Sequence, residues 1–169
     1  DETDVHNYPL LDISTTPGSL NSVKYPMAGQ KSEYAKIGVY NLSTNKTIYL
    51  QTVHEKDDYV TNLTWGPNDQ FIYIAELNRE QDHLKWAKYN VETGERIQTL
   101  YEERNEKWVE PEYPLYFIPN KTNEFITLSE RDGFMNIYHY NTNGKLITQV
   151  TKNKWVINKI KKIINNTIY

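Results

Sequence analysis

The sequence predicts an all-β protein, a partial β-propeller that forms an open arc of about three four-stranded antiparallel blades. Among its 169 residues are fourteen Tyr and four Trp, and aromatic side chains pack well on a pleated sheet. The dipeptide Tyr-Asn recurs at Tyr40, Tyr89 and Tyr140, at intervals of 49 and 51 residues. A repeat of this length is typical of a propeller blade. Each copy also ends a strand-like run and is followed by a turn and another such run, as in a hairpin.

The middle repeat shows the expected blade most fully. Its apolar side chains fall on alternate positions or in short runs, which predicts strands over roughly 62–66, 71–77, 84–90 and 96–101. The turn residues between these runs include Asn and Gly, which supply the positive φ of tight turns. A sandwich or a barrel would also contain many short strands, but it would not require one strand pattern to recur with its turn. The repeat therefore favours the propeller.

The next repeat matches the middle one in order and spacing. Pro67 and Pro119 are 52 residues apart, and so are Arg79 and Arg131. A repeated Arg is typical of a structural clamp between neighbouring strands. The whole chain is therefore interpreted as a fragment of one propeller domain, beginning and ending within a blade. Its predicted parts are the later strands of a blade with an extended arm (5–53), a complete blade (60–107), the next blade (113–151) and the start of a further blade (155–169).

Composition and charge exclude several classes of function. A net charge of −3 gives no reason to bind nucleic acid, which requires Lys and Arg to neutralise phosphates. No apolar run approaches the roughly 20 residues that span a bilayer, so no membrane span is expected. The chain has no Cys, and its four His are scattered, so neither a metal site nor a cofactor is predicted.

The chain also lacks the sequence signature of a catalytic serine. No Gly-x-Ser-x-Gly occurs, which is the strand-to-helix turn that exposes the nucleophile of an α/β-hydrolase. Ser129 stands between Leu128 and Glu130 and is expected to end a strand. The adjacent pair Glu102 and Glu103 is expected to form a solvated turn after the fourth strand of a blade. We therefore predict no catalytic residue in this chain.

An ordered set of segments resembles one known family. These segments are 25–30 (YPMAGQ), 37–42 (IGVYNL), 64–68 (TWGPN), 77–83 (LNREQDH), 108–109 (WV), 129–134 (SERDGF) and 144–151 (GKLITQVT), followed by Trp155. Their succession is similar to the middle of the N-terminal propeller of dipeptidyl peptidase IV, a serine peptidase of the prolyl oligopeptidase type, and above all to its bacterial relatives.

The resemblance implies the function of a parent protein. That parent would be a periplasmic or cell-surface exopeptidase that removes dipeptides with Pro or Ala in second position. The propeller would gate and position the peptide substrate for a C-terminal α/β-hydrolase domain carrying the catalytic residues, beyond Tyr169. The family's ammonium-binding Glu pair would lie before Asp1, so Glu102 and Glu103 do not match it. The alternative is a propeller-like module that binds protein partners without an attached peptidase.

Two segments take a predicted role from the same resemblance. The loop 108–114 matches the position where a blade junction extends toward substrate, so Glu110, Glu112 and Tyr113 are the substrate-facing candidates. The alternative is an ordinary interblade loop stiffened by two prolines. The arm from Leu10 to Tyr25 matches a propeller extension used in family dimers, which predicts a homodimer. Its alternative is a disordered loop.

Overall fold

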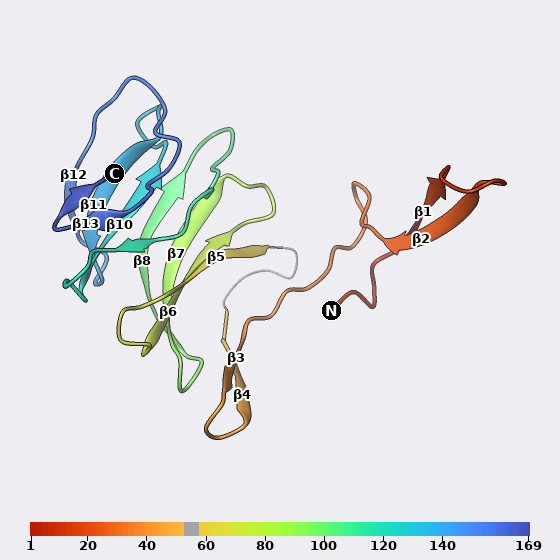
Figure 1. The fold of residues 1–169 in the computed structure, drawn as a ribbon, viewed down its shortest axis with the longest axis horizontal. Helices are drawn as coiled ribbons and strands as arrows, with labels where there is room; N and C mark the ends of the chain where they lie inside the picture. The colour runs from red at the N-terminus through yellow and green to blue at the C-terminus, as the bar shows by residue number, and fades with distance from the viewer. Residues whose placement is uncertain (53–57) are drawn as a thin grey trace. The chain divides into compact units, whose positions relative to one another are not determined.

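The computed structural model describes residues 1–52 and 58–169, and these residues form β-strands, turns and loops with no helix. None of them, therefore, belongs to a helix that is long and apolar enough to cross a membrane. They divide into two compact units, 1–35 and 36–169 without the undescribed residues. The predicted all-β fold is confirmed (Figure 1). Val53, the end of the first predicted part, lies outside the described residues.

The first unit contains the predicted arm, which is an antiparallel hairpin of β1 (Asn7–Asp12) and β2 (Ser19–Lys24). The hairpin starts three residues before the predicted arm, and its regular pairing contradicts the alternative of a disordered loop. Leu11 pairs with Leu20, so both side chains lie on one face. They are 65% and 72% exposed.

The middle repeat forms a complete four-stranded sheet in the order β5-β6-β7-β8. Each strand pairs antiparallel with the next through a short turn, as in a propeller blade. The four strands are β5 (Tyr59–Trp65), β6 (Phe71–Leu77), β7 (His83–Asn90) and β8 (Arg96–Arg104). β8 extends three residues beyond the predicted end, because Glu102, Glu103 and Arg104 continue to pair with β7.

The next repeat forms a second four-stranded sheet of the same design, in the order β12-β11-β10-β9. Its strands are β9 (Tyr116–Phe117), β10 (Glu124–Ser129), β11 (Asn136–Asn141) and β12 (Leu146–Gln149). Ser129 is the last residue of β10, as expected. His139 is half-buried on β11 and lies 2.8 Å from Glu124, which explains it as a strand residue.

Two smaller sheets flank these blades within the second unit. β3 (Gly38–Asn41) and β4 (Lys46–Tyr49) form a hairpin that contains the first Tyr-Asn. β13 (Ile163–Ile164) and β14 (Thr167–Ile168) form another. The tail from 155 to 169, the predicted start of a further blade, contains this short hairpin, because Asn165 and Asn166 adopt positive φ and turn the chain back.

The central blade is buried on both faces because a neighbouring sheet packs on each side. Along β6, Ile72 and Ile74 pack with Leu50 on one face, whereas Tyr73 and Ala75 join Phe125, Tyr138 and other residues on the opposite face. All six residues from Ile72 to Leu77 are buried. The run is apolar except for Glu76, which is paired with Arg96 and accepts from Tyr89, since neither face meets water.

The same glycine turn joins each sheet to the sheet before it. Gly94 follows β7 with a φ of 74°, and Gly144 follows β11 with a φ of 84°. A Cβ atom at Gly94 would lie 2.4 Å from the carbonyl oxygen of Tyr49, and one at Gly144 would lie 2.1 Å from that of Leu100. Gly therefore allows each turn to approach the backbone of the preceding sheet.

Candidate functional site

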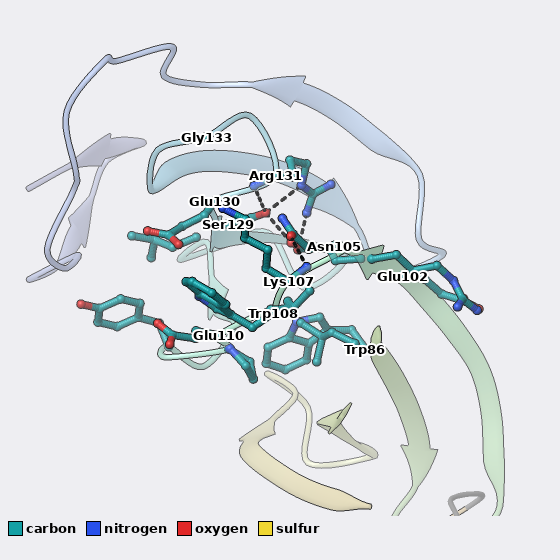
Figure 2. A pocket seen from close by; sticks show the side chains of 17 residues that line it. Trp86, Glu102, Asn105, Lys107, Trp108, Glu110, Ser129, Glu130, Arg131 and Gly133 are labelled. Carbon is teal, nitrogen blue, oxygen red and sulfur yellow. Dashed lines mark hydrogen bonds and ion pairs between the residues drawn. The ribbon is translucent and has the colours of Figure 1, made fainter. Parts of the chain in front are cut away.

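A cavity of about 340 Å³ lies where the ends of β7, β8 and β10 meet the loop from β8 to β9. Its volume is that of a small-ligand pocket. Figure 2 shows side chains from the loop and from both sheets around it. Its walls combine apolar side chains with charged ones. The lining residues are Leu84, Trp86, Glu102, Glu103, Arg104, Asn105, Lys107, Trp108, Val109, Glu110, Pro111, Tyr113, Leu128, Ser129, Glu130, Arg131 and Gly133.

The loop that forms one wall is held by hydrogen bonds to the central blade. β5 is bulged between Thr61 and Thr64, and Asn62 adopts a φ of 51° there. The Asn62 side chain donates to the carbonyl oxygen of Pro111, and the Leu115 amide donates to the Thr64 hydroxyl at 3.3 Å. A bulge re-aims a side chain in this way. The loop is thus fixed to a rigid sheet.

The turn between β6 and β7 holds the same loop from its other end. The Val109 amide donates to the Gln81 carbonyl at 2.7 Å, and the Asn105 amide donates to the Asp82 carbonyl at 3.0 Å. These bonds satisfy the backbone of a loop that has no ladder of its own. They also place Trp108 at the edge of the cavity, where its side chain is 56% exposed.

A buried ion pair forms the floor of the cavity and joins the two four-stranded sheets. Glu103 on β8 has a side chain only 8% exposed, and its carboxylate lies 2.7 Å from the Arg131 guanidinium. The Ser129 hydroxyl donates to the same carboxylate at 2.6 Å and accepts from Arg131 Nε at 2.8 Å. The expectation of a solvated turn at Glu102 and Glu103 was wrong, because the β8 ladder continues and turns Glu103 inward.

Three tyrosine rings surround the guanidinium of Arg131. It lies 4.3 Å from the ring centroid of Tyr138, 5.1 Å from Tyr101 and 5.7 Å from Tyr140. Burial lowers the pKa of Arg131, but the Glu103 carboxylate together with Tyr140 and Tyr101 more than offsets this and raises the pKa above its usual range. Burial also raises the pKa of Tyr101 well above its usual value, so this hydroxyl stays neutral.

Arg131 therefore acts as the predicted clamp, and Arg79 acts differently. Arg131 binds Glu103 and Tyr140 from separate guanidinium nitrogens instead of grasping one carboxylate with two. Arg79 donates to the Tyr59 hydroxyl of its own sheet and lies 5.4 Å from that ring. Each of the two repeated arginines donates to a tyrosine hydroxyl, but Arg131 also spans two sheets.

Two of the three predicted substrate-facing residues line the cavity. Glu110 is exposed, and Tyr113 is half-buried with its hydroxyl donating to the Asn158 carbonyl. Glu112 is exposed but is not among the lining residues. The prediction missed the floor, Glu103 and Arg131, and the Trp86 that packs beside it. The sequence signal for the floor was the repeated Arg. It predicted a clamp at Arg131 but did not identify Glu103 as the carboxylate that Arg131 binds.

The arrangement is suited to binding. Ser129 is 4% exposed, and its hydroxyl donates to the Glu103 carboxylate, which is itself paired with Arg131, so Ser129 serves as a structural link within the floor. Within 1–52 and 58–169 no cluster of three or more His, Asp or Glu side chains could hold a metal ion. The floor is a neutralised ion pair, the walls include the aromatic side chains of Trp86 and Trp108, and Glu110 and Glu130 provide negative charge. Such a pocket can hold and orient a ligand.

Comparison with solved structures identifies the architecture. The chain superposes with a TM-score of 0.87 and 40% identity on a crystal structure assigned as a dipeptidyl aminopeptidase IV from Bacteroides ovatus, covering 95% of this chain and 25% of that one. It superposes on Porphyromonas gingivalis dipeptidyl peptidase 4 with a TM-score of 0.83 and 23% identity, covering 95% and 23%. The predicted partial propeller, an open arc of antiparallel sheets, is confirmed.

Sequence comparison gives the same assignment. The chain is 27% identical over 165 residues to dipeptidyl peptidase 4 of Felis catus and 23% identical over 147 residues to that of Trichophyton rubrum. It covers 21% and 19% of these relatives, about a fifth of their length. The family model of the dipeptidyl peptidase IV N-terminal region matches residues 1–168. The chain therefore belongs to the dipeptidyl peptidase IV N-terminal region family.

Proposed function

We propose that this chain is the non-catalytic propeller portion of a dipeptidyl peptidase IV-like serine exopeptidase. In the parent protein it gates and positions peptides, from which a C-terminal α/β-hydrolase domain removes N-terminal dipeptides with Pro or Ala second. The observation that carries the proposal is the family match over residues 1–168. The parent is expected in the periplasm or at the cell surface.

The alternative is a propeller-like module that binds protein partners and has no attached peptidase. A fold alone does not separate the two, since one fold hosts many functions. The similarity of this chain to named dipeptidyl peptidases favours the first. A coding sequence that continues into a Gly-x-Ser-x-Gly followed by Asp and His would support the peptidase, and a stop codon soon after Tyr169 would support the module.

The loop residues Glu110, Glu112 and Tyr113 are expected to contribute to peptide binding in the parent. Replacing them together with Gln, Gln and Phe should raise KM for peptide substrates several-fold and leave kcat nearly unchanged, because they would bind the ground state and the transition state equally. Steady-state kinetics of the full-length protein on Ala-Pro peptides would measure both constants. Glu92→Gln, an exposed carboxylate on the β7–β8 turn, is the matched control. A lower kcat at unchanged KM would contradict this role.

We also infer that the parent forms a homodimer through its arm. The hairpin of β1 and β2 exposes the paired side chains of Leu11 and Leu20, and exposed apolar patches of this kind mark protein contacts. Replacing both with Asp should shift the parent from dimer to monomer in sedimentation velocity. Asn21→Asp adds charge to the other face of β2 and should leave the dimer intact. Equal sedimentation of all three proteins would contradict an arm-mediated dimer.

A further inference from the structure

The mouth of the cavity presents an aromatic ring flanked by carboxylates. Trp108 exposes 56% of its surface there, although aromatic side chains of this size are usually well buried. Figure 2 shows the Trp108 side chain with Glu130 on one side and Glu110 on the other. The indole ring comes from the β8–β9 loop and Glu130 from the turn after β10. Two separate segments therefore converge on one opening.

Among the residues that the structure describes, these two carboxylates differ from the others in the cavity in having no ion pair. Glu103 is neutralised by Arg131 on the floor, and Glu102 lies 2.7 Å from His83. For the part of the chain that the structure describes, no salt bridge involves Glu110 or Glu130.

The cations of the cavity wall compensate this negative charge only in part. Arg104 lies 4.0 Å from the Glu102 carboxylate, so its positive charge compensates Glu102 and not Glu110 or Glu130. Lys107 has its ammonium 6.0 Å from the Trp108 ring centroid, at the outer limit of a cation–π contact. Lys107 is therefore the one lining cation left to compensate the two carboxylates of Glu110 and Glu130, so the mouth keeps a net negative charge.

The interior behind this mouth is apolar and uncharged overall. Leu84 and Trp86 are each only 2% exposed and line the cavity together with Leu128. The Glu103–Arg131 pair forms the polar part of the floor, and its charges cancel. A ligand with an apolar stem and a cationic end matches this order of surfaces, because the stem meets the apolar wall while the charge stays at the wet rim.

We propose that this cavity binds an arginine side chain of a peptide, and the proposal rests on the peptide-handling function inferred above. Arginine fits better than lysine because its planar guanidinium can stack on the Trp108 indole while its donors reach the carboxylates of Glu110 or Glu130. Lysine offers only a compact, strongly hydrated charge. The cavity thereby gives the parent a preference for basic peptides in addition to its preference for Pro or Ala.

Binding of two capped amino acids to the full-length protein tests this proposal. N-acetyl-arginine methylamide carries the guanidinium, and N-acetyl-citrulline methylamide has nearly the same shape without the charge. By calorimetry or ligand-observed NMR, the arginine probe should bind about tenfold more tightly than the citrulline probe. Added salt should weaken the arginine probe, since its partners are exposed carboxylates. Equal affinity of the two probes would overturn the proposal.

Three variants locate the binding. Trp108→Leu, Glu110→Gln and Glu130→Gln should each weaken the arginine probe about threefold to tenfold, and the two Glu variants should leave the citrulline probe unchanged. Glu92→Gln removes an equally exposed carboxylate that does not line this cavity and should have no effect on either probe. Full affinity of the arginine probe in all three cavity variants would place its site elsewhere and overturn the assignment.

A parallel activity measurement separates this inference from the proposed function. If the full-length protein releases dipeptides but shows no preference for the arginine probe, the arginine site is wrong and the peptidase assignment stands. If it binds the arginine probe as expected but releases no dipeptide, the peptidase assignment is wrong and the cavity still binds arginine.

Discussion

Replacing Gly144 with Ala is expected to destabilise the chain by about 3 kcal/mol. Two effects add, because the residue has a positive φ of 84° and the new Cβ would lie 2.1 Å from the Leu100 carbonyl oxygen. The first effect costs about 1–2 kcal/mol and the overpacking about 1–3 kcal/mol. Urea-induced unfolding followed by Trp fluorescence measures the loss.

Gly133 provides the matched control for this substitution. Its φ is 95°, but a Cβ atom there would have no neighbour within 4 Å. Gly133→Ala should therefore cost only about 1–2 kcal/mol, the penalty for the backbone conformation alone. Equal losses for the two substitutions would show that the contact between the β11–β12 turn and β8 does not hold the sheets together.

Replacing Glu103 with Gln is expected to cost about 3 kcal/mol. The substitution keeps the size of the side chain but leaves the Arg131 guanidinium, only 26% exposed, without a carboxylate partner. Removing one member of a buried pair typically costs about 3–5 kcal/mol, because the remaining charge stays desolvated. Since this pair joins β8 to the turn after β10, the backbone amides of both β8 and β10 should exchange their hydrogens faster in the variant.

The neighbouring residue Glu102 serves as control. Its side chain is 45% exposed and lies 2.7 Å from His83 within the same sheet. Glu102→Gln should change stability by less than about 1 kcal/mol, as is usual for exposed pairs. Equal effects of Glu102→Gln and Glu103→Gln would contradict the role of Glu103 as a buried link between blades.

The sequence predicted the repeated part of the fold well because the repeat itself carries the information. Tyr89 and Tyr140 close equivalent strands, β7 and β11, and the turns that follow them contain the glycines that contact the preceding sheet. Alternating side chains along β6 face two different cores. Local pattern and tertiary packing agree here, which is the condition under which sequence reasoning succeeds.

The site was harder to predict because its parts come from segments far apart in the chain. Asn62 holds the loop through a bulge in β5, and nothing in its local sequence shows that its side chain reaches Pro111. Glu102 and Glu103 looked like an exposed acidic pair, but successive side chains of a strand point to opposite faces of the sheet, so only Glu103 turns inward. Burial of Glu103 depends on Arg131, 28 residues away.

The most direct test of the central proposal is hydrolysis of a Gly-Pro-linked chromogenic amide by the full-length protein and, in parallel, by this chain alone. The proposal predicts dipeptide release by the full-length protein and none by the chain, since the chain supplies binding surfaces and the hydrolase domain supplies the nucleophile. Release by the chain alone would contradict the non-catalytic role of the propeller, and no release by either protein would contradict the peptidase assignment.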